Sequence, residues 1–206
     1  MKKHITVQYI ANRSREWLYR KMNPDVPWLT QEANAFLSSW LKPTMKGVEL
    51  GSGRSTIWFA KRVQHLISIE SDKSWYDRIS GQLKSQGLNN VEYHLGPITQ
   101  NETIASAPYL APLIAAGDNM FDFLLVDGEY RDYAALVGVE KVKSSGILIV
   151  DNVNWFLPSG SISPASLAIN QPCLTSTWDK FNTLVKDWKT IWTSNGVSDT
   201  AIFIKP

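Results

Sequence analysis

The sequence has little cysteine, little excess charge and no long hydrophobic run. Its single cysteine, Cys173, excludes a disulfide bond within the chain and is typical of a reducing compartment. Lysine and arginine exceed aspartate and glutamate by only 21 to 19, and no more than two basic residues stand together, so no surface for nucleic acid is indicated. The apolar runs are far too short to span a bilayer, and the basic N-terminus lacks the apolar stretch of a signal peptide. We therefore expect a cytoplasmic protein without a membrane or nucleic-acid partner.

An ordinary globular composition accompanies these absences. The chain has 206 residues, of which 44% are hydrophobic and 19% charged, so we expect one α/β domain that folds without a metal or a disulfide. Five short apolar runs are typical of buried strands: residues 47–50, 66–69, 91–95, 121–126 and 147–150. Helical spacing between and after these runs predicts helices over residues 54–63, 73–86, 102–116, 132–142 and 178–187.

Apolar strands that alternate with helices form a parallel sheet covered on both faces. Right-handed crossovers then make the expected α/β fold a doubly wound, Rossmann-like one. Three further segments are expected outside these strands and helices. Residues 1–45 form a helical N-terminal extension that caps the fold, residues 153–175 form a lid loop, and residues 189–193 and 201–204 form a closing β-hairpin.

The most informative stretch is VELGSGRST, residues 48–56. A strand that leads into a Gly-x-Gly turn and then a helix brings backbone N–H groups against a ligand. Taken alone, such a turn is equally typical of an ordinary structural turn. Acidic residues stand nearby at two strand ends: Glu49 precedes the turn, and Glu70 ends the second strand, 19 residues after Gly51. An acid in the latter place can accept hydrogen bonds from both hydroxyls of a ribose.

Four stretches together, VELGSGRST, ISIESD, FDFLLVDGEYRDY and GILIVDN, resemble the class I S-adenosylmethionine (SAM)-dependent methyltransferases. Within this class they are similar to a small bacterial group whose motifs read E-x-G-S-G-x-S-T and V-D-G. The resemblance covers about residues 37–152 and the closing hairpin. It implies a seven-stranded sheet, mostly parallel, whose last strand is antiparallel. It also implies that the glycine turn approaches the methionine part of SAM and that Glu70 holds the ribose.

Carried over by position, the resemblance implies a cofactor-binding set at the turn and at the ends of the second and fourth strands: Glu49, Gly51, Ser52, Gly53, Ser55, Thr56, Glu70, Ser71, Asp127 and Gly128. One position departs from the family. Many members place an acid after the third strand, near the adenine amino group, whereas residues 94–97 read HLGP here. Adenine recognition is then expected to come from backbone groups.

The reacting centre is expected where the fourth and fifth strands end. Asp127, Asp151 and Asn152 stand there, and two carboxylates with an amide oxygen are suited to Mg²⁺ or Ca²⁺. The arrangement resembles the metal ligands of catechol and caffeoyl-CoA type O-methyltransferases, in which a metal would lower the pKa of an acceptor hydroxyl. The alternative is that Asp127 bonds to backbone or cofactor amines and that Asp151 and Asn152 cap a turn.

The candidates for proton handling depart from those enzymes in one respect. The family carries a basic residue shortly after the first metal-binding acid, whereas Glu129 and Tyr130 follow Asp127 and Gly128 here. Arg131 is close, but its guanidinium is too strongly protonated to act as a base. The candidates for catalysis are therefore Asp127, Glu129, Tyr130 and Asp151.

These patterns favour a methyltransferase that passes the methyl group of SAM to a small molecule, with O-methylation slightly preferred to N-methylation. An NAD-type oxidoreductase is disfavoured, because a full Gly-x-Gly-x-x-Gly is absent and Thr56 stands in the place of its third glycine. A SAM-binding protein without activity, which regulates or scaffolds a partner, stays open because the catalytic set is weak. A metal cofactor and a homodimer stay open as well.

Overall fold

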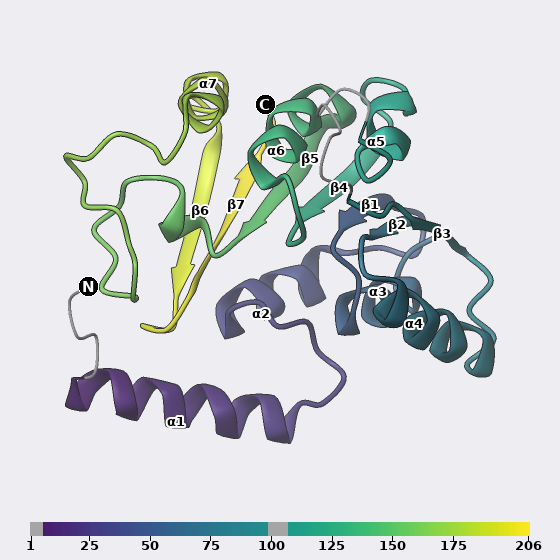
Figure 1. Cartoon of the computed structure of the whole chain (residues 1–206), viewed down its shortest axis with the longest axis horizontal. Helices are drawn as coiled ribbons and strands as arrows, with labels where there is room; N and C mark the ends of the chain where they lie inside the picture. Colours follow the sequence, from purple (N-terminus) through teal and green to yellow (C-terminus); the bar gives the residue numbers. More distant parts are fainter. Residues whose placement is uncertain (1–5, 99–106) are drawn as a thin grey trace.

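The five apolar runs and the closing hairpin form a seven-stranded sheet that runs through the molecule (Figure 1). The computed structural model describes residues 6–98 and 107–206. Along the sheet the strands follow the order β3-β2-β1-β4-β5-β7-β6. Their bounds are β1 (Lys46–Leu50), β2 (His65–Glu70), β3 (Val91–Leu95), β4 (Phe121–Val126), β5 (Val142–Asp151), β6 (Lys189–Ser194) and β7 (Asp199–Ile204).

The direction of the strands follows the doubly wound pattern. Strands β1 to β5 run parallel to one another, whereas β7 is antiparallel to both β5 and β6. The order reverses at β1, because the chain passes outward to β2 and β3 and then returns to place β4 on the other side of β1. A sheet of this kind opens a crevice at the reversal, beyond the carboxyl ends of its strands. The predicted fold is therefore confirmed.

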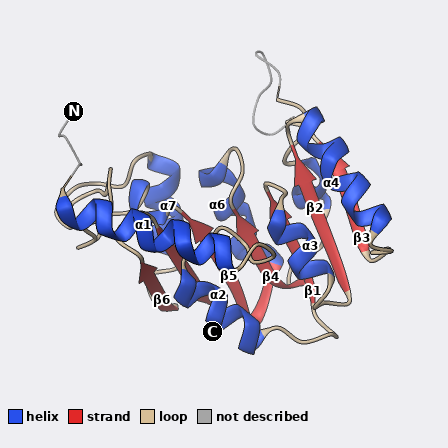
Figure 2. Cartoon of the chain, turned by 90° about the horizontal axis from the view of Figure 1, so that it is seen from below, coloured by secondary structure: helices blue, strands red, loops and turns tan. Residues whose placement is uncertain are grey.

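Helices cover both faces of the sheet (Figure 2). One face carries α5 (Ala111–Ala115), α6 (Arg131–Lys141) and α7 (Ser176–Leu184), and the other carries α2 (Gln31–Trp40), α3 (Arg54–Ala60) and α4 (Lys73–Ser85). Alternate residues of a strand point to opposite faces. In β4, Leu124 and Val126 join the core with α6 and α7, whereas Phe123 and Leu125 join the core with α2 and α3. Because both faces are apolar, this strand is a continuous hydrophobic run in the sequence.

Local chemistry sets where several elements begin. The Asp72 carboxylate accepts a hydrogen bond from the Trp75 N–H at 2.7 Å, and α4 begins after this cap. β5 begins at Val142, before the predicted strand. The polar residues that follow Val142 break the apolar pattern, and the pairing with β4 shifts register there, where Ser145 has φ +63°. Part of the helix predicted over residues 102–116 lies outside the described residues. Within the described part of that segment, α5 spans Ala111–Ala115 and has a proline in its first turn.

The N-terminal extension contains α2 and a longer helix, α1 (Val7–Met22), which lies beneath the hairpin in Figure 1. The polar side of α1 points inward: Asn12 and Glu16 are buried, whereas Trp17, Leu18 and Met22 are exposed. An ordinary surface helix has the opposite arrangement. In the described part of the chain, no helix is both long and apolar enough to cross a membrane.

Residues 153–175 fold back on the closing hairpin. The segment begins with the short 3-10 helix η2 (Val153–Trp155), and Asn154 Nδ2 donates a hydrogen bond to the Pro164 carbonyl at 3.2 Å. Ser163 Oγ donates to the buried Asp199 carboxylate at 2.6 Å, which ties the segment to β7. The role of this segment as a lid stays a prediction.

Candidate active site

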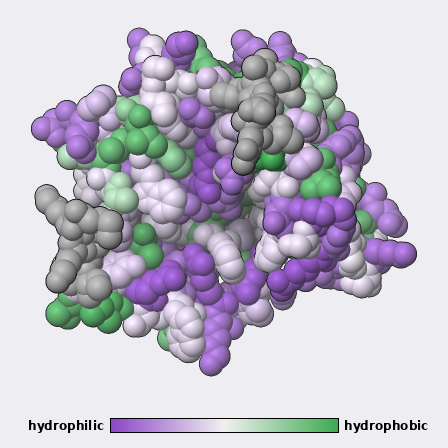
Figure 3. All heavy atoms as spheres, viewed as in Figure 1, coloured by the Kyte–Doolittle hydropathy of each residue, from purple (hydrophilic) through white to green (hydrophobic). Residues whose placement is uncertain are grey.

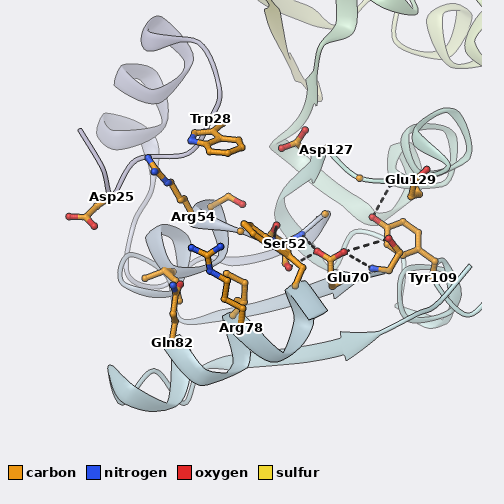
Figure 4. A pocket seen from close by; sticks show the side chains of 18 of the residues that line it. Asp25, Trp28, Ser52, Arg54, Glu70, Arg78, Gln82, Tyr109, Asp127 and Glu129 are labelled. Carbon is orange, nitrogen blue, oxygen red and sulfur yellow. Dashed lines mark hydrogen bonds between the residues drawn. The ribbon is translucent and has the colours of Figure 1, made fainter. Parts of the chain in front are cut away.

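A cavity of about 710 Å³ opens at the carboxyl ends of β1, β2 and β4, where the strand order reverses. Hydrophilic side chains gather around the hollow in the middle of the face that Figure 3 shows. The cavity extends from the turn after β1 to helix α4 (Figure 4). Most residues of the predicted cofactor-binding set line it: Gly51, Ser52, Gly53, Ser55, Glu70, Ser71, Asp127 and Gly128.

Close backbone contacts explain the glycines at this place. Gly51 has φ +92°, and a Cβ atom on it would lie 2.7 Å from Gly128 N. A Cβ atom on Gly128 would in turn lie 1.8 Å from the hydroxyl of Tyr109, a fully buried side chain that the sequence analysis does not single out. Any side chain at either glycine would push the ends of β1 and β4 apart. Both positions therefore need glycine.

Four hydrogen bonds of 3.1 Å or less hold the Glu70 carboxylate at the wall of the cavity. One oxygen accepts from Ser52 N at 3.1 Å and from Ser52 Oγ at 2.6 Å, and the other accepts from Ser71 N at 2.8 Å and Asp72 N at 2.9 Å. Ser52 Oγ also lies 2.6 Å from the Tyr93 hydroxyl. Glu70 thereby joins the glycine turn to the start of α4. A carboxylate oriented in this way can accept further hydrogen bonds from the neighbouring hydroxyls of a sugar.

Glu49 lies beneath the glycine turn, outside the cavity lining. It is fully buried, its Oε1 accepts a hydrogen bond from Ser68 Oγ at 2.7 Å, and its Oε2 has no hydrogen-bond partner among the described residues. Burial raises the pKa of Glu49 to about 7, and hydrogen bonds from nearby hydroxyls offset part of this rise. Thr56 is buried as well, and its Oγ1 accepts from Gly53 N at 2.9 Å. Both residues support the turn from below, and their predicted contact with a cofactor stays a prediction.

The buried Glu49 carboxyl leads to a pH-dependent prediction. Its pKa is about 7 in the folded protein and 4.5 ordinarily, so between these values the folded protein binds more protons than the unfolded chain. The free energy of unfolding should therefore fall as pH rises through this range, by about 3 kcal/mol from this group. In Glu49→Gln this part of the fall should be absent when urea unfolding is measured at both ends of the range. The exposed Glu32→Gln is the control, and parallel pH curves for Glu49→Gln and the wild type would contradict the assignment.

A second cavity, of about 260 Å³, lies between α1 and the ends of β4 and β5. Trp28 and Asp127 line both cavities, so Asp127 stands at the boundary between them, and Figure 4 shows it across the first cavity from Trp28. Asp151, Asn152 and Trp155 also line the second cavity. The structure therefore brings together the three residues predicted at the reacting centre.

Arg131 joins the strand ends beside this cavity and is the most connected residue of the site. Its Nε donates to the Gly128 carbonyl at 2.8 Å, and Nη1 donates to the Asp151 carbonyl at 2.8 Å and to Asn152 Oδ1 at 3.1 Å. Its Nη2 donates to the Asp127 carbonyl at 2.8 Å and lies 3.3 Å from the Asp127 carboxylate. All three nitrogens of the guanidinium thus have hydrogen-bond partners. We call Arg131 and these four partners the arginine clip.

Asp127 and Asp151 both have a pKa above the ordinary range. Burial is the main cause for each; in Asp151 the charge of Asp127 adds to it, and in Asp127 the positive charge of Arg131 opposes it. Thr200 Oγ1 donates a hydrogen bond to Asp151 Oδ1 at 2.7 Å, and the same hydroxyl accepts from Thr30 N at 3.2 Å. This relay fixes the orientation of the Asp151 carboxyl. A buried, oriented carboxyl with a raised pKa is suited to accept a proton near neutral pH.

The donors at the end of β5 do not fit the predicted metal. The Arg131 guanidinium already lies 3.3 Å from the Asp127 carboxylate and 3.1 Å from Asn152 Oδ1, so a divalent cation would face a positive charge among its own ligands. Among residues 6–98 and 107–206, no group of three or more histidines, cysteines, aspartates and glutamates could hold a metal ion. Arg131 supplies the positive charge in this place.

Glu129 and Tyr130, the other candidates for catalysis, lie in different places. Glu129 is exposed and lines the first cavity. Tyr130 is outside the described lining of both cavities, and its ring centroid is 6.4 Å from that of Tyr109. At the end of β3, where the family often has an acid, Gly96 is buried against the Tyr109 backbone. Roles for Glu129 and Tyr130 in the reaction stay predictions.

No protein-family model matches the chain, and neither does any curated protein sequence. Solved structures do resemble it. One is a Staphylococcus aureus protein provisionally assigned as a caffeoyl-CoA O-methyltransferase, with 15% identity and TM-score 0.59 over 98% of this chain and 93% of that one. Another is a provisionally assigned Streptococcus mutans methyltransferase in complex with SAH, with 9% identity and TM-score 0.53 over 85% and 97%. A third is a Streptococcus thermophilus rRNA methylase, with 10% identity and TM-score 0.52 over 84% and 94%. The chain therefore has the fold that these structures share.

Proposed function

We propose that the protein is a SAM-dependent methyltransferase that methylates a hydroxyl group of a small molecule. The observation that carries the proposal is the first cavity: it lies at the reversal of the sheet and is walled by the glycine turn, by the oriented Glu70 carboxylate and by Gly128. A nucleoside with an amino-acid chain matches this lining, because Glu70 can accept from ribose hydroxyls and the turn offers backbone N–H groups. The bound SAH of the S. mutans protein supports the same cofactor.

The second cavity is the proposed place of the acceptor, because it meets the first at Asp127. When bound, SAM supplies a methyl group on a positively charged sulfur. Asp151 accepts the proton of the acceptor hydroxyl, and the oxygen electron pair forms the new C–O bond. When the S–CH₃ bond breaks, its electron pair stays on sulfur, and S-adenosylhomocysteine (SAH) is the product. The chain contributes mainly position and proton acceptance, which together govern such an in-line transfer.

A small acceptor is favoured over RNA, although a solved rRNA methylase has the same fold. The net charge is only +2, and the second cavity measures about 260 Å³, below the usual size of a drug-sized ligand site. RNA binding requires a basic surface that neutralises phosphates. In the sequence no more than two basic residues stand together.

Calorimetric titration with SAH, run beside NAD⁺, tests the proposal. Micromolar binding of SAH and none of NAD⁺ is expected. Glu70→Ala should weaken SAH binding by about 1.5–3 kcal/mol, because a charge-assisted hydrogen bond to the ribose is lost. The exposed Asp77→Asn on α4 is the control for loss of a carboxylate. Binding of NAD⁺ instead, or SAH affinity unaffected by Glu70→Ala, would overturn the cofactor assignment.

A further inference from the structure

The helix α1 brings a positively charged cluster to the second cavity. Glu16 is buried and forms ion pairs with both Arg13, at 2.6 Å, and Arg20. The helical spacing of three and four residues places both guanidiniums beside the one carboxylate. Two guanidiniums around one carboxylate leave a net positive charge, and all three residues line the cavity.

The opposite wall of the cavity has the reverse composition. There the side chains of Asp127 and Asp151 line the cavity. The Asp127 carboxylate lies 3.3 Å from the Arg131 guanidinium, which donates a hydrogen bond to the backbone carbonyl of Asp151. The two walls are close enough to act on each other: burial raises the pKa of Asp127, whereas the charges of Arg131 and Arg20 oppose that rise. The cavity therefore has a proton-accepting wall next to the proposed cofactor site and a positively charged wall on α1.

Two indole rings also line the cavity. Trp28 is 50% and Trp155 is 41% exposed, which is unusual for tryptophan, and both line the cavity. The guanidiniums of Arg20 and Arg54 lie 5.0 Å and 5.4 Å from the Trp28 ring centroid. Guanidiniums therefore lie over the Trp28 ring, and the indole of Trp155 is the one suited to pack against an aromatic ring.

We propose that the second cavity binds a small aromatic hydroxy acid, whose carboxylate pairs with Arg13 and Arg20 and whose hydroxyl faces Asp127 and Asp151. The proposal rests on the methyltransferase function and names the acceptor class for it. A neutral phenol would leave the positive wall without a partner, and a compound without a hydroxyl would give the carboxyl wall nothing to deprotonate. The size of the cavity, about 260 Å³, suits a single ring with its substituents.

The test is calorimetric titration of the full chain, first saturated with SAH, with 3-hydroxybenzoate and with its neutral counterpart 3-hydroxybenzyl alcohol. The acid should bind at least tenfold more tightly than the alcohol. In Arg13→Gln this preference should be lost, while affinity for the alcohol and for SAH is unchanged. Arg15→Gln is the matched control, because Arg15 is exposed on the same helix and lies outside the cavity lining.

The outcomes separate the two proposals. Equal binding of the two compounds, binding of neither, or an unchanged preference in Arg13→Gln would overturn the hydroxy-acid assignment while SAH still binds. Failure of SAH to bind the folded wild-type protein would instead overturn the proposed methyltransferase function, and the acceptor assignment with it. A preference for the acid that disappears in Arg13→Gln and persists in Arg15→Gln would support both.

Discussion

Replacing Arg131 with alanine is expected to lower the free energy of unfolding by about 3–5 kcal/mol, the usual loss when one partner of a buried ion pair is removed. The side chain is only 18% exposed, and the arginine clip holds the ends of β4 and β5 together. Without it, three backbone carbonyl oxygens and the Asp127 carboxylate lose their charged partner at once. SAH affinity should fall too, because Gly128 and Asp127 line the first cavity.

A lysine substitution for Arg131 tests how much of the stability comes from the positive charge and how much from the planar shape of the guanidinium. Arg131→Lys keeps the positive charge but presents a single nitrogen, which cannot reach three carbonyls arranged around a planar fork. It should therefore recover only a minor part of the stability lost in Arg131→Ala. Urea unfolding measures both variants, with the exposed Arg15→Ala as the control. A loss below about 1 kcal/mol in Arg131→Ala, the range of an exposed ion pair, would show that the clip contributes little.

Asparagine in place of Asp151 is expected to lower kcat by about 10²–10⁴-fold, the usual contribution of a positioned general base. The amide keeps the size of the side chain and still accepts the hydrogen bond from Thr200, but it cannot take up a proton. SAH affinity should be unchanged, because Asp151 lines the second cavity and not the first. Conversion of SAM to SAH in the presence of the acceptor measures the rate.

The pH profile gives the same prediction a second readout. Because burial and the neighbouring Asp127 raise the pKa of Asp151, wild-type kcat/KM should decline as pH falls through that raised pKa, where the carboxyl becomes protonated. The residual activity of Asp151→Asn should lack this decline, whereas the exposed Asp187→Asn should keep the wild-type profile. A wild-type rate in Asp151→Asn would exclude Asp151 as the base.

The sheet could be predicted from the sequence because its central strands are apolar on both faces. Residues such as Phe123 and Leu124 point to opposite cores, so the strand stands out without any alignment. The glycine turn and Glu70 could be predicted as well. A close approach of two backbones requires glycine, and ribose binding at a strand end requires an acid, so each feature is visible as a residue type in the sequence. The same holds for the Asp72 cap. These features depend on short stretches of chain.

The rest of the site depends on contacts that a sequence does not display. The guanidinium of Arg131 is too strongly protonated to act as a base, and its role in the clip depends on backbone carbonyls, which every residue has. The burial of Glu49 is a further example: its neighbours Val48 and Leu50 face α6 and α7, so its side chain points to the opposite face of the sheet, where Ser68 bonds to it. The charged wall on α1 depends on the approach of that helix to the ends of β4 and β5, a tertiary contact that the sequence does not display.

The relay Thr30–Thr200–Asp151 joins segments far apart in the chain: Thr30 and Thr200 are separated by 170 positions, and Asp151 and Thr200 by 49. The contact between Ser52 and Glu70, by contrast, spans only 18 residues. Chains are synthesised from the N-terminus, and contacts distant in sequence form late in folding. A nascent chain can therefore shape the proposed SAM pocket well before its catalytic base is oriented. The capacity to bind SAM would therefore form earlier in biosynthesis than the capacity to transfer its methyl group. The latter would require the final hairpin, which carries Thr200.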